Sequence, residues 1–324
     1  MDTHNFLKPT VSVRLMTFNH AKFVTQALDS ALAQQTSFPI EVVIGDDYSN
    51  DGTHATLETY QKRFPDKIRL LKRPLNGAYW QKRQHGNHLT NFVDIVENCH
   101  GKYIALLDGD DMWTDTNKLQ QQVDFLDKNP DYVMSCHYVR YLNEEQGTFK
   151  FPDMSFSQAY DTYTLDDLLK GNFITTCSVV FRNNYQIPNW FTQLSVGDWP
   201  LYIILCGLSK GKIHCLNQYL ATYRIHTGGV FSLQTKISQV KRLIDVCGIL
   251  LKQNNFLDYN QQRLLRKLEA EYHLQLLSTI HTKTIDRKTR LKWFFETVKR
   301  IKYFSSTEFR YLLVYFLDTL TNRK

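Results

Sequence analysis

One stretch constrains the fold of this chain more than any other, the sequence Tyr-Ile-Ala-Leu-Leu-Asp-Gly-Asp-Asp-Met-Trp at residues 103–113. Its first five residues, Tyr103 to Leu107, are non-polar or aromatic, which predicts a strand covered on both faces, as in a parallel sheet. Three carboxylates follow within four residues. They therefore lie where α/β sheets place their ligands, just beyond the carboxyl end of a strand.

The carboxylates of Asp108, Asp110 and Asp111 repel one another, and Gly109 allows the backbone to bend between them. A divalent cation that shares its oxygen ligands with a diphosphate would stabilise such a turn. The alternative is a surface turn of Asp and Gly before a helix, because an amphipathic run begins at Asn117. The turn taken alone does not decide between the two.

Strand-like and helix-like segments alternate through the first half of the chain. Further strands are predicted at 11–16, 40–44, 68–71 and 132–142. Helices are predicted at 22–34, 53–64, 89–99 and 119–126. The segment 73–86 is rich in Gly, Asn and basic side chains and is expected to be a loop able to neutralise a diphosphate. The alternation predicts an α/β fold with a mostly parallel, doubly wound, Rossmann-like sheet flanked by helices.

The pattern changes after residue 142. Residues 143–163 hold Gly, Pro, Ser and aromatic residues without a period, as expected of a loop that faces a ligand or partner. Strands are predicted at 174–181 and 219–225, with an apolar helix at 199–208 between them. From Gln234 onward the pattern is helical.

These changes predict a catalytic domain at 1–232 and a C-terminal helical region at 233–324. The net charge of +7 lies entirely near the end, since residues 281–324 hold 11 basic and 4 acidic side chains. One predicted helix there has an apolar face bordered by lysines; the apolar residues are Leu291, Phe294, Phe295, Val298 and Ile301, and the lysines are Lys288, Lys292 and Lys299. This helix is expected either to pack on the catalytic domain or to lie on an anionic membrane surface.

The six cysteines are widely spaced, without a Cys-x-x-Cys pair or a His cluster at zinc spacing, which predicts buried or free thiols in a reducing compartment. The first ten residues lack the apolar core of a signal peptide, and no apolar stretch approaches the ~20 residues that span a bilayer. A cytoplasmic protein is expected, with the inner face of the plasma membrane as its alternative location.

The ordered motifs resemble the inverting family 2 glycosyltransferases of the GT-A fold, of bacterial type, over roughly residues 10 to 230. Val11-Ser12-Val13 followed by Thr17-Phe18-Asn19 is similar to the family's opening strand, after which Tyr-Asn is usual. Phe can still stack on a base, though it lacks the hydroxyl. The resemblance implies that Thr17, Phe18 and Asn19 contact the nucleotide.

Two acidic motifs extend the resemblance. The sequence at 44–53 is similar to the family's Asp-Asp-Gly-Ser-x-Asp-Gly-Thr signature, which implies that Asp47 contacts the nucleotide base, and Tyr48 replaces the usual Gly. Asp108-Gly109-Asp110 is similar to the family's Asp-x-Asp motif. The resemblance implies that Asp108 lies near the ribose and the metal, and that Asp110 is the principal metal ligand.

Two later motifs match as well. Gly197-Asp198-Trp199 resembles the position of the catalytic base, whereas an acid at a helix start is otherwise read as an N-cap. The sequence at 223–229 resembles a segment that closes over the diphosphate, which implies that His226 assists the metal or the phosphate. A structural role for this single His is the alternative.

The resemblance implies transfer of a sugar from a nucleotide diphosphate sugar, a UDP-sugar first, to an acceptor hydroxyl with inversion. Mn²⁺ or Mg²⁺ is the implied cofactor, and a glycan, a lipid-linked oligosaccharide or a protein is the implied acceptor, in bacterial surface polysaccharide synthesis; no nucleic acid partner is expected. A nucleotide-sugar-binding protein without turnover is one rival. An aspartyl-phosphate phosphatase is another, but that fold requires a small hydroxyl residue soon after the second Asp, where Asp111-Met112-Trp113 stands.

Overall fold

The computed structural model describes residues 8–85, 89–152, 162–229, 234–253, 255–278, 286–307 and 309–310. Its contacts divide the chain into two compact units. The first, here called the sheet unit, comprises residues 1–165, 173–193 and 197–229. The second, the helical unit, comprises residues 166–172, 194–196 and 230–324. Each is described by itself.

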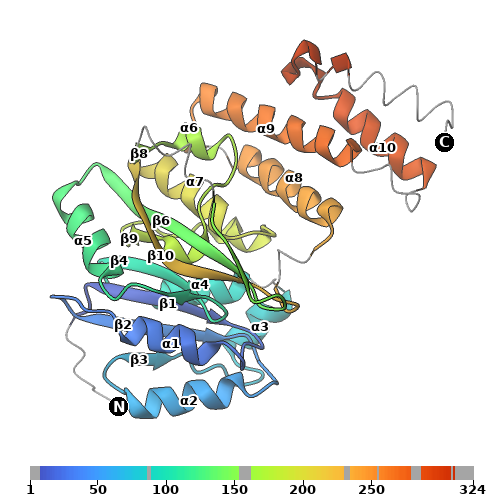
Figure 1. Ribbon diagram of the computed structural model, residues 1–324. Helices are drawn as coiled ribbons and strands as arrows, with labels where there is room; N and C mark the ends of the chain where they lie inside the picture. The colour runs from blue at the N-terminus through green and yellow to red at the C-terminus, as the bar shows by residue number, and fades with distance from the viewer. Residues whose placement is uncertain are drawn as a thin grey trace. The chain divides into compact units, whose positions relative to one another are not determined.

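Four parallel strands form one half of the sheet (Figure 1). They are β1 (Val11–Thr17), β2 (Ile40–Asp46), β3 (Ile68–Leu70) and β4 (Tyr103–Asp108), in the spatial order β3-β2-β1-β4. The chain therefore builds outward from β1 to β3 and then returns to the other side of β1. Ligands of open α/β sheets bind at the carboxyl ends of the strands at such a reversal, which here falls between β1 and β4.

The other half of the sheet is mixed. The strand β9 (Val180–Arg182) runs antiparallel to both β4 and β6 (Tyr132–Asn143), and β10 (Lys212–Ile225) runs parallel to β6. Short antiparallel strands complete it, namely β5 (Met112–Trp113), β7 (Thr148–Lys150) and β8 (Thr162–Tyr163). The longest pairings are parallel, as the sequence predicts.

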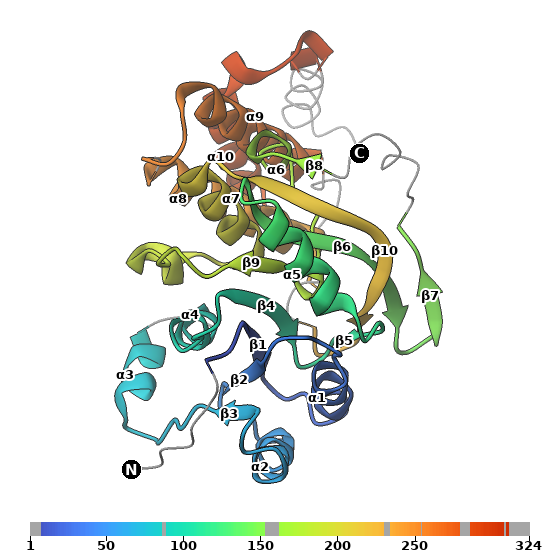
Figure 2. The same cartoon turned by 90° about the vertical axis from the view of Figure 1, so that its left-hand side faces the viewer.

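Helices cover both faces of the parallel half. Figure 2 shows α1 (Val24–Leu32) and α2 (Thr53–Arg63) on one side, with α3 (Ala78–His85) and α4 (Leu89–Glu97) on the other. Covered on both faces, β1 and β4 bury nearly every residue. The remaining α-helices among the described residues before 230 are α5 (Lys118–Lys128), α6 (Leu165–Leu168) and α7 (Asp198–Ser209).

Most of the predicted elements are confirmed, but three segments differ. Residues 73–86 contain α3, since the run from 78 to 85 holds helix-forming Gln, Lys and Arg, outweighing the Gly and Asn at the flanks. Residues 143–163 contain β7 and β8, with 153–161 outside the described residues. Residues 174–181 form a 3₁₀ turn, η2 (Thr176–Ser178), before the short β9. All six cysteines are buried and unpaired, as predicted.

The helical unit contains α8 (Lys236–Lys252), α9 (Tyr259–Ser278), α10 (Arg287–Val298) and a 3₁₀ turn, η5 (Ile301–Tyr303). Thr235 and Asp286 cap α8 and α10 by accepting a hydrogen bond from a backbone N–H three residues on. In α10, Phe294 packs against Leu274 and Leu277 of α9, whereas Phe295 is 57% exposed. Among the described residues, no helix is both long enough and apolar enough to cross a bilayer.

Candidate functional site

The carboxyl ends of β1, β2 and β4 bring three predicted motifs together. The register places Thr17 beside Asp46 and Met16 beside Asp108. Thr17 Oγ1 donates to Asp46 Oδ1 at 2.9 Å, and the Asp47 N–H donates to the Thr17 carbonyl at 3.0 Å. The Gly109 N–H donates to the Met16 carbonyl at 2.8 Å. Backbone pairing therefore joins both acidic turns to the end of β1.

Gly109 is required by this close approach. A Cβ at that position would lie 2.6 Å from Thr17 Cγ2 and 2.9 Å from His20 Nδ1. Both distances are shorter than van der Waals contact, so any side chain here would displace the acidic turn from β1.

The loop after β2 is held by its own polar side chains. Asp46 accepts hydrogen bonds from Ser49 Oγ at 2.5 Å and lies 3.1 Å from His54 Nδ1. Asn19 accepts from the Asn50 N–H at 3.0 Å, and its own N–H donates to Ser49 Oγ at 2.8 Å. Asn19 and Asp46 therefore both hold the loop after β2 in place by hydrogen bonds.

Tyr48 explains how this chain departs from the usual Asp-Asp-Gly sequence. Its φ of +63° is in the left-handed region, which favours glycine and costs other residues backbone strain. The Tyr48 ring lies 5.9 Å from Tyr79 and 5.5 Å from Trp80, both on α3, between ring centroids. These aromatic contacts offset the strain, so the loop keeps the glycine-like turn with a tyrosine in it.

Asp47 is held by two residues that the sequence did not single out. Arg83 Nε lies 3.0 Å from both carboxylate oxygens, and the Tyr79 hydroxyl donates to Asp47 Oδ1 at 2.8 Å. Burial raises the pKa of Tyr79, and the Asp47 charge raises it further, so the hydroxyl remains a donor. Because Tyr79 and Arg83 are four residues apart, a helix predicted at 78–85 would have placed them on one face.

Phe18 lies just beyond β1 with 51% of its surface exposed. Phe18 is the one large hydrophobic residue of the Thr17-Phe18-Asn19 motif, and Thr17 before it is buried and bonded to Asp46. An exposed ring at the carboxyl end of a central strand can stack on a planar ligand.

Asp108 forms an ion pair with a buried arginine, Arg14. Arg14, which is fully buried in β1, donates from Nη1 to Asp108 Oδ1 at 2.6 Å, and its guanidinium lies 4.6 Å from the centre of the Phe92 ring. The charge of Asp108 is therefore already compensated by the protein.

Asp110 is surrounded by imidazoles instead. Its Oδ2 lies 3.1 Å from His226 Nε2 and 3.6 Å from His20 Nε2. Burial alone would raise the pKa of Asp110, but the His226 hydrogen bond and the charges of His20 and His226 lower it below its usual value. The structure thus brings His226 onto the Asp-x-Asp turn from the end of β10, 116 residues away.

Asp111, the third acid of the turn, is buried and bonded to the end of β10. Its Oδ1 accepts the Arg224 N–H at 2.9 Å, while burial, followed by the charges of Asp110 and Asp108, raises the pKa of this carboxyl well above its usual value. Arg224 also donates from Nη1 to the Asp110 carbonyl at 2.9 Å and from Nε to Glu144 at 2.6 Å. The end of β10 therefore clamps the acidic turn through Arg224, which the sequence did not identify.

The donor set suits a hard divalent cation that takes few protein ligands. Within the described ranges, no three His, Cys, Asp or Glu side chains are arranged to hold a metal by themselves. Mg²⁺ usually keeps several waters and is held by one or two carboxylates together with substrate phosphates. Asp110 is the better candidate ligand, because Asp108 is bound to Arg14 and His226 already lies against Asp110.

Asp198 is the first residue of α7, and Gly197 stands at the N-cap, so Asp198 is not the cap that its sequence position suggested. Its Oδ2 accepts from Thr176 Oγ1 at 3.5 Å. Burial raises the pKa of the nearby Tyr202 hydroxyl, and the charges of Asp198 and Asp108 raise it further. Asp198 and Asp108 thus both act on the pKa of the buried Tyr202 hydroxyl.

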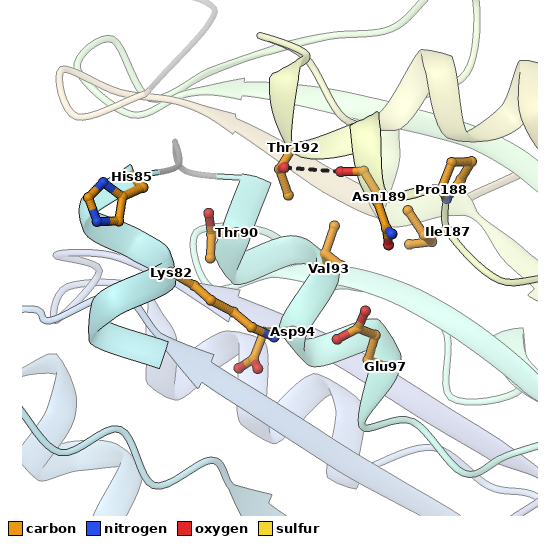
Figure 3. A pocket seen from close by; sticks show the side chains of 10 residues that line it. All are labelled: Lys82, His85, Thr90, Val93, Asp94, Glu97, Ile187, Pro188, Asn189 and Thr192. Carbon is orange, nitrogen blue, oxygen red and sulfur yellow. Dashed lines mark hydrogen bonds between the residues drawn. The ribbon is translucent and has the colours of Figure 1, made fainter. Parts of the chain in front are cut away.

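A cavity of about 260 Å³ lies beside this site, between α3, α4 and the segment 187–192 (Figure 3). Its ionisable lining residues are Lys82, His85, Asp94 and Glu97. Asp94 also forms an ion pair of 2.6 Å with the buried Arg73, which accounts for one basic residue of the segment 73–86 expected to neutralise a diphosphate. The cavity shares α3 with the two residues that hold Asp47.

The chain is similar in sequence to several bacterial proteins. An uncharacterized protein of Mycobacterium tuberculosis is 34% identical over 222 residues, which is 68% of this chain and only 60% of that relative. An uncharacterized glycosyltransferase of Rickettsia prowazekii is 33% identical over 85% of this chain and 91% of its own. The putative teichuronic acid biosynthesis glycosyltransferase TuaG of Bacillus subtilis is 29% identical over 72% of this chain and 85% of its own.

The fold is that of solved GT-A enzymes. TarS of S. aureus in complex with UDP-GlcNAc matches 96% of this chain and 89% of its own with a TM-score of 0.63 at 17% identity. The mannosyltransferase PcManGT of Pyrobaculum calidifontis, in complex with GDP-Man and Mn²⁺, matches with a TM-score of 0.54 at 14% identity, over 98% and 88% of the two chains. The family model described as glycosyl transferase family 2 matches residues 12–186. The chain belongs to this family.

Proposed function

We propose that this chain transfers a sugar from a nucleotide diphosphate sugar to an acceptor hydroxyl with inversion, and that the sheet unit carries both donor binding and chemistry. The observation that carries the proposal is the meeting of Asp47, Asp108 and Asp110 at the reversal of strand order, with His226 3.1 Å from Asp110. A ligand with a planar base at one end and a diphosphate at the other fits such a series of polar groups.

The base end of the donor is assigned to Phe18 and Asp47. An exposed ring offers a stacking face, and a carboxylate accepts an imino proton. A carboxylate has about four lone-pair sites, of which Tyr79 and Arg83 use three here, so Asp47 Oδ2 retains room for one more donor. Because TarS is described in complex with both UDP-GlcNAc and UDP, a UDP-sugar is the first donor to test.

The diphosphate end is assigned to Asp110 and His226, with Asp108 near the ribose. Mn²⁺ or Mg²⁺ is the proposed cofactor, and when bound it would stabilise the negative charge that develops on the leaving diphosphate. His226 orients Asp110 through its 3.1 Å contact, and Arg224 fixes the Asp110 backbone by its hydrogen bond to the carbonyl at 2.9 Å. Both residues come from the end of β10, which therefore contacts both the side chain and the backbone of Asp110.

The acceptor end is assigned to Asp198. As a general base it would accept the proton of the acceptor hydroxyl while that oxygen attacks the anomeric carbon from the face opposite the diphosphate. One displacement of this kind inverts the anomeric configuration. Thr176 positions the carboxylate by donating to Oδ2 at 3.5 Å.

The proposed acceptor is a glycan or a lipid-linked oligosaccharide of a bacterial cell-surface polymer, assembled on the cytoplasmic side of the membrane. The support is the similarity to TuaG, which is described as a putative teichuronic acid biosynthesis glycosyltransferase. A protein acceptor remains the alternative.

The experiment is a transfer and hydrolysis screen of the purified protein against a panel of UDP-, GDP- and TDP-sugars, with Mn²⁺ and with EDTA. One donor should be consumed in the presence of the metal, and NMR should show a product of anomeric configuration opposite to the donor's. Binding of a nucleotide sugar without turnover on any acceptor would favour a binding protein instead. A product that retains the donor's configuration would rule out the single displacement.

A further inference from the structure

The helical unit contains a cavity of about 310 Å³ between α9 and η5. Four of its lining residues come from the first two turns of α9 and two from η5, and they are Tyr259, Gln262, Arg263, Arg266, Lys302 and Tyr303. The spacing of 259, 262, 263 and 266 puts the α9 residues on one face of the helix. The cavity lies wholly within this unit, whose helices are orange to red in Figure 1.

Its charges are all of one sign. Arg263, Arg266 and Lys302 line the cavity together with no acidic side chain. In the part of the chain that the structure describes, none of these three cations forms an ion pair. Converging cations repel one another, so this cavity gains stability when an anion enters it.

Two neighbouring lysines, Lys267 of α9 and Lys299 at the end of α10, do form ion pairs. Lys267 pairs with Glu271 at 3.7 Å, and Lys299 pairs with Glu296 at 2.8 Å. Both of these acidic residues are thus paired with cations that do not line the cavity.

Contacts outside the cavity hold its two elements together. Arg300 pairs with Glu269 of α9 at 2.7 Å, and the Tyr303 N–H donates to the Arg300 carbonyl at 2.9 Å. Glu269 is buried, so this ion pair anchors η5 against α9. Lys302 lies 5.2 Å from the centre of the Tyr303 ring, which restricts where its ammonium group can go.

We propose that this cavity binds the phosphate group of a phosphate ester. A guanidinium presents two parallel N–H donors that match phosphate geometry, and the cavity supplies two guanidiniums and an ammonium group. The hydroxyls of Tyr259 and Tyr303 add donors, and their rings offer apolar surface to the organic part of the ester. The ester is either the headgroup of an anionic phospholipid or a soluble phosphate, and the proposal does not depend on the transfer chemistry proposed above.

The test compares the full-length protein with two variants. Arg263→Gln with Arg266→Gln removes two cations of the cavity, while Lys267→Gln removes one from the same helix outside it. Binding of sn-glycerol 1-phosphate is measured by calorimetry, and binding to phosphatidylcholine vesicles with and without phosphatidylglycerol is measured by sedimentation. Circular dichroism and binding of UDP verify that the fold and the sheet unit are unchanged.

The double variant should bind the phosphate ester about tenfold or more weakly, because two charge-assisted contacts are lost, whereas Lys267→Gln should bind like the wild type. Loss of binding to glycerol phosphate identifies a soluble ester, and loss confined to phosphatidylglycerol vesicles identifies a lipid headgroup. Equal binding by the double variant and the wild type, or no binding of either probe by the wild type, overturns the proposal.

Discussion

Arg14 donates to Asp108 from inside the sheet: Nη1 lies 2.6 Å from Oδ1, and the arginine side chain is 0% exposed. Asp110, two residues later, pairs with no arginine or lysine among the described residues and instead lies 3.1 Å from His226 Nε2. The two acids of one motif therefore have different roles. Asp108 is held by the protein, whereas Asp110 can exchange an imidazole contact for another ligand.

This pairing makes a prediction about stability. Arg14→Met should lower the free energy of unfolding by about 3 to 5 kcal/mol, because removal of one partner leaves the other charge without compensation in a half-buried site. Urea unfolding at neutral pH measures it. Lys102→Met is the matched control, since Lys102 pairs with Asp127 on the surface, and it should cost under about 1 kcal/mol. Equal losses in the two variants would contradict the role assigned to Arg14.

The second prediction concerns the metal. Asp110→Asn should weaken Mn²⁺-dependent binding of the donor nucleotide about tenfold or more, because a charged oxygen contact is lost at a site with few ligands. Asp127→Asn, an exposed acid of the same unit, should have no effect. Calorimetry with Mn²⁺ and with EDTA separates metal-dependent from metal-independent binding of the nucleotide. If the wild type binds the nucleotide equally well in both, Asp110 does not hold a metal.

The third prediction concerns the base. Phe18→Ala should raise the dissociation constant of the donor, since stacking on an aromatic side chain is worth about 1 to 3 kcal/mol per base. Asp47→Ala should raise it too, and Arg83→Met should act in the same direction because Asp47 loses the contact at 3.0 Å that orients it. Titration with uridine and with pyrophosphate localises the effect, which should appear with uridine alone. If Arg83→Met binds the donor more tightly than the wild type, Arg83 competes with the base for Asp47.

The parallel sheet and its acidic ends were predictable because they are local patterns. The apolar run Tyr103 to Leu107 predicts a buried strand, and the carboxylates of the Asp-x-Asp motif follow it directly in the chain. Contacts between distant segments have no such signal. Arg83 meets Asp47 across 36 residues, and Arg224 meets Asp110 across 114, so neither pairing could be read from spacing.

The predictions for residues 73–86 and 174–181 were wrong because contacts with distant residues, and not the local pattern, decide the structure of these segments. The sequence predicts a loop at residues 73–86 because the apolar pattern of α3 is weak. Among the described residues of this helix, only Tyr79 is buried. Tertiary contacts of Tyr79 and Arg83 with Asp47 support that helix instead. The interior of 174–181 is likewise broken into a 3₁₀ turn and a short strand, although its apolar run is typical of one strand.

A fourth prediction follows from Lys118, which is fully buried with its ammonium 4.3 Å from the centre of the Trp113 ring. Its Nζ has no hydrogen-bond partner among the described residues, and burial lowers the pKa of Lys118 to about 7. The unfolded chain therefore binds more protons than the folded chain above that pH. The free energy of unfolding should rise by about 1 to 2 kcal/mol from pH 7 to 8.5.

Lys118→Met should remove this rise and increase stability at pH 7, because the methionine avoids the cost of burying an amine. Lys128→Met, at the exposed end of the same helix, should leave the pH dependence of the wild type unchanged. Urea unfolding at the two pH values measures both effects. A wild type whose stability is constant over this range would show that Lys118 does not titrate there.

The last prediction separates an active transferase from a protein that only binds the donor. Asp198→Asn keeps the size of the side chain and the hydrogen bond from Thr176, but it removes the basicity of the carboxylate. Donor affinity should therefore change little, while transfer to the acceptor should fall by about 10²- to 10⁴-fold, the usual contribution of a general base. Initial rates at saturating donor, together with donor titrations, give both quantities.

Asp131→Asn is the matched control, because Asp131 is an exposed acid of the sheet unit that pairs with Lys212 at 2.9 Å, and it should retain full activity. A general base must also be deprotonated, so the rate of the wild type should fall at acidic pH, and the residual rate of Asp198→Asn should lose that dependence. If Asp198→Asn turns over like the wild type, the base must be another acid. Glu144 is already bound to Arg224 at 2.6 Å, which would direct the search to the exposed Glu145 beside it.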